Sequence, residues 1–323
     1  MVAGRLKQLL KRPAARWIEF RCRWSKRRVG LALCYHHVSD PQGDPERELV
    51  PALGTERFEA HVRYLKRRFR LVRASELLDA ARERRRGGRF PVAITFDDDL
   101  PSHVRGAMPV LERHGAPATF FLNGASLERP FAFWWERLQR AWDRGELDPG
   151  TLEELMAGEV DPGQPTIKRV SAAIQALPPG RRRELAQELG NHAGPDPPDS
   201  GMRAGDVRRL AAAGFEIGFH TLHHDALPGL DDPALSEAMI DGKGELERAA
   251  ETPVVAIAYP YGKVDRRVAD AARTAGYRWG FTSSAEAVGP GSDRLMLGRH
   301  DAGVGTVGDL ALGLARDLRD WRE

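Results

Sequence analysis

Three adjacent aspartates, Asp97, Asp98 and Asp99, follow a short apolar run at residues 92–96. Carboxylates that leave a buried strand side by side repel one another unless a cation or a shared proton relieves the repulsion. A metal ion is the economical answer, with one carboxylate as its ligand and a neighbouring one free to act as a general base. Asp99 has an alternative role, because an aspartate just before Pro101 could cap the helix that follows.

A histidine pair, His220 and His224, follows a second apolar run. Two imidazoles four positions apart can bind one cation if the chain bends after the strand. Two histidines and one carboxylate, with a position left open for water, make a catalytic zinc-type site. Zn²⁺ is the default ion for such ligands, and Co²⁺, Ni²⁺ or Mn²⁺ are compatible with them.

Polar residues directly follow three further apolar runs. They are Tyr35-His36-His37, Tyr261-Gly262 and His300. In parallel α/β folds, chemistry gathers at the carboxyl ends of the strands, where the loops converge. Because packing alone hardly explains five such strand ends, we expect them to share one rim.

Short apolar runs alternate with amphipathic helical stretches from residue 29 onward. The predicted strands are residues 29–35, 91–96, 118–122, 216–220, 254–259, 277–282 and 294–297. Most of them are continuous apolar runs, which are typical of parallel strands covered on both faces. This repetition predicts an α/β fold, an irregular (β/α)7-type barrel rather than a doubly wound sheet.

One stretch, at about residues 128–200, breaks the alternation and predicts a helical insertion after the third strand, ended by a proline-rich linker. Its Trp134 and Trp135 could line a sugar-binding cleft, since aromatic faces stack on pyranose rings. The alternative, which we favour, is that both tryptophans pack the insertion's own helices.

The first 28 residues carry ten lysines and arginines against Glu19 alone. We therefore divide the chain into a basic N-terminal extension, 1–28, and a catalytic domain, 29–323. Since the whole chain has a net charge of +3, the domain is mildly acidic, and nucleic-acid binding gains no support. The two cysteines, Cys22 and Cys34, are expected to be idle thiols.

The basic extension contains apolar residues that could line one side of a helix broken near Pro13. They are Leu6, Leu9, Leu10, Trp17, Ile18 and Phe20. Such a helix could anchor the protein peripherally on anionic lipid, and the alternative is a solvated extension. The extension lacks the uninterrupted apolar stretch of a signal peptide, so we expect a cytoplasmic protein, with any membrane contact at the inner face.

Four short motifs resemble those of the polysaccharide deacetylases (NodB homology domain, carbohydrate esterase family 4). They are Thr95-Phe96-Asp97-Asp98, His220-Thr221-x-x-His224, Tyr259-Pro260-Tyr261-Gly262 and the Tyr35-His36 element. The resemblance covers roughly residues 29–300, and the first two motifs together are quite specific.

The resemblance implies roles for individual residues. Asp97 would be the general base, and Asp98, His220 and His224 would hold the metal ion. The backbone N–H of Tyr261 would help to stabilise the oxyanion. The family usually supplies a general-acid histidine from a late Leu-x-x-His motif. His300 fits that spacing, although it could equally be a structural histidine at a strand end.

The sequence also departs from the family pattern. Asp99 stands where the first motif usually ends in glycine, and Ala258 stands where the third motif usually begins with an arginine that orients the base. Arg299 could substitute for that arginine from another strand. Trp279 is a weak counterpart of the fourth motif's tryptophan, and the role of His103 is an open question.

The sequence as a whole predicts a metal-dependent hydrolase that removes acetyl groups from an N- or O-acetylated carbohydrate, with an acetylated glycan as its partner. Two alternatives remain open. One is a related hydrolase of a non-sugar amide or cyclic imide. The other is a glycan-binding protein that has lost catalysis, for which Asp99 and Ala258 are the motivation.

Overall fold

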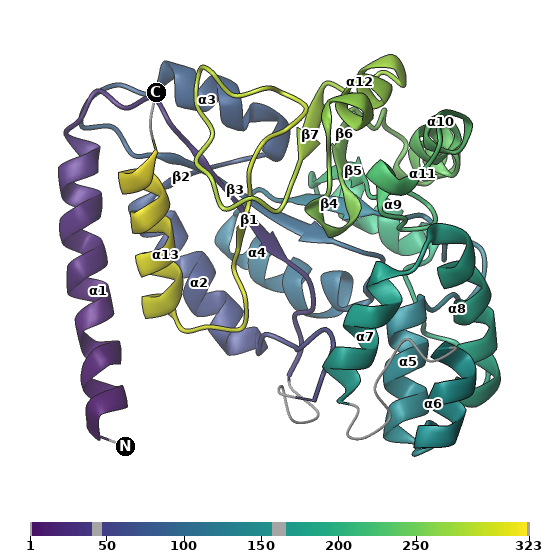
Figure 1. Ribbon diagram of the computed structural model, residues 1–323. Coiled ribbons are helices and arrows are strands. Elements are labelled where there is room, and N and C mark those ends of the chain that lie inside the picture. Colours follow the sequence, from purple (N-terminus) through teal and green to yellow (C-terminus); the bar gives the residue numbers. More distant parts are fainter. Residues whose placement is uncertain (1, 41–46, 157–165, 322–323) are drawn as a thin grey trace.

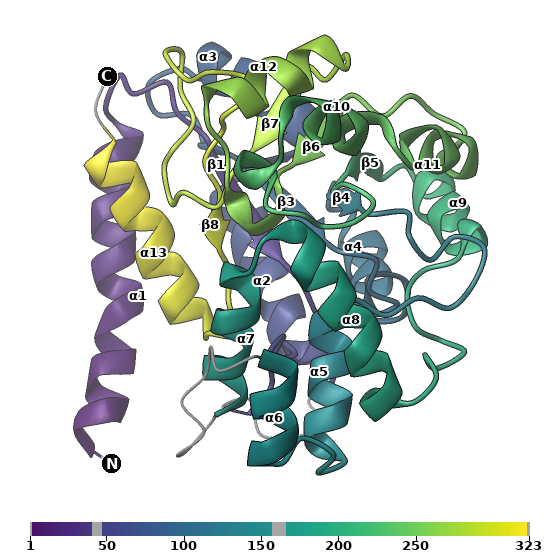
Figure 2. The same ribbon diagram turned by 45° about the vertical axis from the view of Figure 1, so that its right-hand side comes forward.

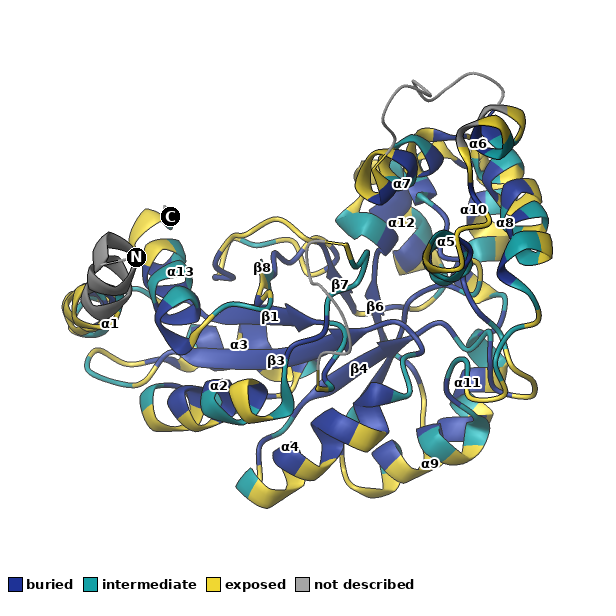
Figure 3. Ribbon diagram, turned by 90° about the horizontal axis from the view of Figure 1, so that it is seen from below, coloured by how far each residue is buried: buried dark blue, intermediate teal, exposed yellow. Residues whose placement is uncertain are grey.

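Parallel strands form the centre of the computed structural model, which describes residues 2–40, 47–156 and 166–321. The strands are β1 (Leu31–Tyr35), β2 (Arg70–Val72), β3 (Pro91–Asp97), β4 (Thr119–Leu122), β5 (Glu216–Phe219), β6 (Ala256–Ala258), β7 (Trp279–Phe281) and β8 (His300–Asp301). Their residues are almost all buried, as the dark blue strands in Figure 3 show. This burial is why the strands are continuous apolar runs in the sequence.

All neighbouring strands pair in parallel, in the order β7-β6-β5-β4-β3-β1-β8, and β2 pairs in parallel with the first three residues of β3. A parallel bridge joins Phe281 of β7 to Leu297, which lies just before β8 in the chain. Since β8 pairs with β1, this bridge links the two ends of the curled sheet, β7 and β8. The predicted irregular α/β barrel is therefore confirmed.

Helices surround the sheet (Figures 1 and 2). They are α1 (Val2–Arg23), α2 (Thr55–Arg68), α3 (Leu77–Glu83), α4 (Met108–His114), α5 (Trp134–Asp143), α6 (Pro149–Met156), α7 (Ile167–Ala176), α8 (Pro179–Ala193), α9 (Ala204–Ala212), α10 (Asp232–Ile240), α11 (Lys243–Ala250), α12 (Arg266–Thr274) and α13 (Val307–Asp320). Apolar stripes explain their packing: Phe58, Val62 and Leu65 of α2 are fully buried.

Two strands of the structure differ from the prediction. The strand β2 was not predicted, because it has only three residues and gives too short an apolar run to detect. The segment predicted at residues 294–297 contributes a single bridge at Leu297, and the strand that pairs with β1 begins later, at His300. This shift of the strand changes which side chains face the barrel, with consequences for the site.

The described residues between β4 and α9 form four helices, α5 to α8, and have an apolar cluster of their own that includes Leu138, Val170 and Leu185. In Figure 3 these helices stand together on one side of the sheet, opposite α1 and α13. The division of the chain into an extension and a catalytic domain stays a prediction.

The first helix, α1, is continuous through Pro13, so the predicted break is wrong. It lies against α13, the purple and yellow helices side by side in Figures 1 and 2. Ile18 packs on the main core, whereas Trp17 and Phe20 are exposed, so these apolar residues do not share one side of the helix. The side chains of Leu6, Leu9 and Leu10 lie outside the described part of the chain.

Candidate active site

Asp97, the last residue of β3, is held by an arginine from the far end of the chain. The guanidinium of Arg299 donates two hydrogen bonds to it, Nη1 to Oδ1 at 2.6 Å and Nη2 to Oδ2 at 2.7 Å. Both side chains are buried, with relative exposures of 2% and 4%. Burial alone would raise the pKa of Asp97, but the charge and hydrogen bonds of Arg299 hold it below its ordinary value.

Arg299 therefore contacts Asp97 as the arginine that the family usually has at the position of Ala258 was expected to do. Its Nε also donates to the backbone oxygen of Thr282 at 2.9 Å, and Nη1 donates to Thr95 Oγ1 at 3.2 Å. These contacts fix the planar guanidinium on two sides, so that it orients the carboxylate of Asp97 with both of its oxygens engaged.

Asp98 lies beside the two histidines. Its Oδ1 is 3.7 Å from His220 Nε2 and 3.6 Å from His224 Nε2. These separations are too long for hydrogen bonds. Asp98 Oδ1 is buried and has no hydrogen-bond partner among the described residues. Burial raises the pKa of Asp98, and the charge of Asp97 raises it further.

The two imidazoles present the nitrogen that a cation would need. His220, which directly follows β5, donates from Nδ1 to the backbone oxygen of Ala258 at 2.8 Å and so leaves Nε2 free. Burial lowers the pKa of His220 and of His224, which favours the neutral, ligating form. Thr221 and His224 both have positive φ, 56° and 51°, because the chain turns sharply to bring the second imidazole back.

A divalent metal ion fits this group. The candidate ligand atoms of Asp98, His220 and His224 all lie within 4.8 Å of one another. Two ligands about 2.0–2.1 Å from a tetrahedral ion are roughly 3.4 Å apart, which is close to the distances observed between the Asp98 oxygen and each imidazole. A central cation would also satisfy the orphaned carboxylate oxygen.

A second group of possible ligands, Cys34, His36 and Asp97, suits a cation less well. Both oxygens of Asp97 already accept from Arg299. Burial raises the pKa of the Cys34 thiol, and its Sγ lies 3.4 Å from Asp97 Oδ2 as a donor. A protonated thiol is not a metal ligand.

Asp99 points away from the metal group, toward the loop after β4. Its carboxylate accepts hydrogen bonds from the backbone N–H groups of Asn123 (2.8 Å), Gly124 (3.2 Å) and Ala125 (3.0 Å) and from the hydroxyl of Ser126 (3.1 Å). It does not cap the following helix, so that alternative is wrong. The carboxylate of Asp99 is instead stabilised by these four hydrogen-bond donors.

His103 supports the turn after β3 that carries Asp97 and Asp98. Its Nε2 lies 3.0 Å from the backbone oxygens of both Asp97 and Asp98, to which it donates. The ring is fully buried between Phe96 and Phe120, within a π-helical turn at His103–Ala107. Burial lowers the pKa of His103 to about 4, so the imidazole is neutral at ordinary pH.

His300 does not reach the site, which corrects the expectation of a general acid there. Its Nδ1 lies 2.8 Å from Asp317 Oδ2 on α13, and its ring contacts α13 again at Gly313. Because side chains alternate along a strand, Arg299 and Asp301 face the cleft while His300 faces outward. A histidine spaced correctly in the motif is thus on the wrong face.

His36 is the partly exposed imidazole that does line the cleft. A nitrogen of its ring lies within 4.8 Å of ligand atoms of Asp97 and Cys34. The sequence contained the signal, since His36 directly follows β1, but it gave no reason to prefer His36 over His300.

The cleft has a volume of about 280 Å³ and combines residues from the strand ends with others from the insertion. From the insertion come Trp134 and Trp135 of α5 and Ser171 and Gln175 of α7. Both tryptophans are at most 7% exposed and belong to the insertion's apolar cluster. The two interpretations of these tryptophans therefore both apply: they pack the insertion and they border the cleft.

Tyr261 contacts both the insertion, through Trp134, and the metal group, through His224. Its ring lies 4.6 Å from that of His224, and its hydroxyl accepts a hydrogen bond of 3.2 Å from Trp134 Nε1. Its φ of 57° is held by the hydrogen bond from Gly262 N to Tyr259 O, at 2.8 Å. Trp135 also packs on His224, with ring centroids 4.7 Å apart.

Two carboxylates and two histidines at the carboxyl rim of a parallel α/β barrel could hold a divalent metal ion beside a second carboxylate, which is an arrangement suited to metal-assisted hydrolysis. The sequence profile of the polysaccharide deacetylase family matches residues 84–151 and 186–280, just over half of the chain. The chain belongs to the polysaccharide deacetylase family.

Similar proteins agree with this assignment. YxkH of Bacillus subtilis (strain 168), which is classed with the polysaccharide deacetylases, is 22% identical over 277 residues, or 85% of this chain and 72% of YxkH. The Streptococcus pyogenes deacetylase PplD, solved with acetate, superposes with a TM-score of 0.59 at 15% identity, over 90% of this chain and 98% of PplD. IcaB from Ammonifex degensii superposes with a TM-score of 0.56 at 18% identity, over 90% and 97%. Both structures share the fold of this chain.

Proposed function

We propose that this protein is a metal-dependent hydrolase that removes acetyl groups from an N- or O-acetylated carbohydrate. The observation that carries the proposal is the pair of differently held carboxylates: Asp97 is charged and clamped by Arg299, while Asp98 is buried between two neutral imidazoles. Neighbouring acids whose environments push their pKa values apart are typical of a site that divides base and ligand roles.

In the proposed reaction, Asp97 accepts a proton from the attacking water, and Arg299 keeps the carboxylate ionised and oriented. Asp98, His220 and His224 hold the cation, for which Zn²⁺ is the chemical default. A divalent ion there would supply Lewis acidity for the acetyl carbonyl and the water. Family membership and the donor set support metal dependence.

Two more residues complete the proposal. The backbone N–H of Tyr261 is assigned to the oxyanion, which its turn beside His224 supports. His36 is assigned the proton donation to the leaving amine or alcohol, because it lines the cleft and lies within reach of Asp97, where His300 does not.

The binding-protein alternative has lost its motivation. It rested on Asp99 and Ala258, but the charge of Asp99 is taken up by the loop after β4, and Arg299 clamps the base in place of a residue at Ala258. The acetate in the Streptococcus pyogenes relative is the product expected of a deacetylase and supports the same activity for this chain.

Acetate release by the Asp97→Asn variant tests the proposed base. We expect release from N-acetylated glucosamine oligosaccharides to fall by about 10³-fold while the bound metal is retained, because the amide cannot accept the proton. Unchanged release would remove Asp97 from the mechanism. Release by the wild type from small amides but from no acetylated sugar would favour the non-sugar alternative.

The cytoplasmic location stays a prediction that cell fractionation tests.

A further inference from the structure

The helix α1 has two faces of opposite character. Its inner face packs against α13, with Ala15 and Cys22 buried. Its outer face carries Trp17 and Phe20, and Trp24, directly after the last residue of α1, continues that face; the three are 60%, 60% and 52% exposed. These aromatics recur at the spacing of one helical face, and they are three of the five exposed large apolar side chains in the described part of the chain.

The aromatic face is held rigidly, because α1 is fastened to the domain along its length. Lys11 forms an ion pair with Asp309 at the start of α13, and Glu19 accepts from Arg68 at 3.1 Å. Arg27, just beyond α1, donates to the backbone oxygen of Arg319 at 2.8 Å. A frayed, solvated extension would not make these contacts, so the exposure of the aromatics is a fixed property of the surface.

Exposed basic side chains flank the aromatics. They are Arg12, Arg16 and Arg21 on α1, and Lys26 and Arg28 just after it. Arg21 lies over the ring of Trp17, 4.9 Å from its centroid. Among residues 11–28 the only acid is Glu19, which is buried and paired with Arg68. The outer surface of α1 therefore has no negative charge to offset the positive ones.

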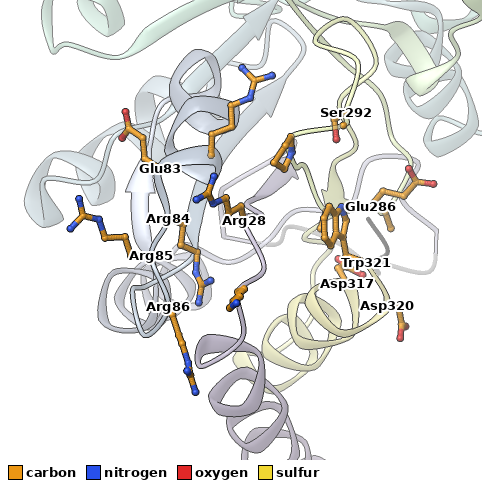
Figure 4. A pocket seen from close by; sticks show the side chains of 16 residues that line it. Arg28, Glu83, Arg84, Arg85, Arg86, Glu286, Ser292, Asp317, Asp320 and Trp321 are labelled. Atoms are coloured by element: carbon orange, nitrogen blue, oxygen red, sulfur yellow. The ribbon is translucent and has the colours of Figure 1, made fainter.

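The basic character continues past the end of α1. A hollow of about 1420 Å³ lies there, and Figure 4 labels Arg28, Arg85 and Arg86 among the side chains that line it. The hollow also carries acids, with Glu83 beside Arg85 and with Asp317 and Asp320 on the far side, so the hollow itself is not an anion site. The rim nearest α1 adds Arg85 and Arg86 to the exposed basic surface.

We propose that the outer face of α1 docks on an anionic phospholipid surface. Trp17, Phe20 and Trp24 enter the headgroup region, where amphipathic aromatic rings are favoured, and the flanking arginines pair with lipid phosphates. A second copy of the chain is the weaker occupant, because two faces of the same positive charge would repel each other. Within the described residues, no helix has the length and apolar character needed to cross a bilayer, so the docking is peripheral.

The position of α1 is compatible with activity at the surface. In Figures 1 and 3, α1 lies at one side of the molecule and the insertion helices α5 to α8 lie at the other. Docking through α1 thus leaves the insertion's wall of the cleft away from the lipid, and a docked enzyme can still receive a glycan.

Vesicle co-sedimentation of the full chain tests the proposal. We expect binding to phosphatidylcholine vesicles that contain about 30% phosphatidylglycerol, little binding to pure phosphatidylcholine, and release in ~1 M NaCl. The triple variant Trp17→Ser, Phe20→Ser, Trp24→Ser should bind at least about ten-fold more weakly with an unchanged Tm. The double variant Ile240→Ser, Met296→Ser, which removes the two other exposed large apolar side chains among the described residues, is the matched control and should bind like the wild type.

Charge is tested separately with Arg12→Glu, Arg16→Glu, Arg21→Glu, which should abolish the preference for phosphatidylglycerol. Equal binding of wild type and aromatic variant would overturn the proposal, as would failure of the wild type to bind the anionic vesicles. A dimer that only the aromatic variant loses, without vesicle binding, would assign the face to a second copy instead.

Discussion

At the scale of single residues, the proposed chemistry depends on Asp97 being ionised. Burial favours its neutral form, and Arg299 outweighs burial through its charge and two hydrogen bonds. The sequence named Arg299 as a possible substitute but could not show the contact, because Arg299 lies 202 positions from Asp97 and reaches it only when β8 closes the sheet beside β1.

Replacing Arg299 by glutamine should therefore change the pH profile as well as the rate. Without the guanidinium, burial raises the pKa of Asp97, so the base becomes protonated at a higher pH than in the wild type. We expect kcat/KM to fall about 100-fold and its acid limb to move to higher pH. Arg299→Lys keeps the charge and should show a smaller displacement. A profile that only scales down would contradict this account of the base.

The two histidine candidates for the general acid can be separated by substitution. His36→Gln should lower kcat by about 10²-fold or more, because the cleft loses its proton donor. His300→Gln should leave kcat unchanged, because that ring faces Asp317 on α13. Steady-state acetate release measures both. The reverse pattern would return the role to His300 and require β8 to turn over.

At the scale of elements, the carboxyl ends of the strands position the site, and the turns after them are shaped by buried polar contacts. The turn after β3 is held from below by His103 and is joined to the loop after β4 by Asp99. Positive φ at Asp98, Thr221, His224 and Tyr261 marks the same rim. For non-glycine residues these conformations cost energy, which the surrounding contacts must offset.

Asp99→Ala tests this support of the loop. The variant leaves the backbone N–H groups of Asn123, Gly124 and Ala125 without their acceptor, so we expect the free energy of unfolding to fall by about 3 kcal/mol. Chemical denaturation measures the loss. Asp199→Ala, which removes an exposed carboxylate paired only with Arg105, is the control and should change stability little. A stable Asp99→Ala protein would show that the loop holds itself.

The insertion should act on substrate binding rather than on the chemical step. Ser171 and Gln175 of α7 line the cleft from the insertion and belong neither to the Asp97–Arg299 pair nor to the metal group. Replacing both by alanine should raise KM for acetylated oligosaccharides several-fold with kcat nearly unchanged, since contacts made equally in ground and transition states affect KM alone. Arg169→Ala on the same helix, outside the cleft lining, is the control. A loss confined to kcat would contradict this role.

At the scale of the whole molecule, the sequence predicted the barrel because buried parallel strands are long apolar runs, and each catalytic run ends in a polar residue. It predicted Asp97, Asp98, His220 and His224 for the same reason. It failed where the elements are shortest. The strand β8 has only two residues, and a shift of one position along a strand exchanges the side chains that face inward and outward. His300 therefore faces α13 instead of the cleft.

The sequence could not show the long-range contacts themselves. Arg299 binds Asp97 across 202 positions, and Lys11 of α1 pairs with Asp309 of α13 across 298 positions. The aromatic spacing on α1 was visible, but only the packing of α1 on α13 shows which apolar residues remain exposed.

The measurement that tests the central claim most directly is acetate release by the wild type before and after metal removal. Acetylated glucosamine oligosaccharides are the substrate, and metal content is followed in the same samples. We predict about one divalent ion per chain, loss of release on chelation, and recovery when Zn²⁺ or Co²⁺ is added back, with no recovery in the Asp98→Asn variant. Release that persists in metal-free protein would contradict the account, because Asp98, His220 and His224 would then have no ion to hold.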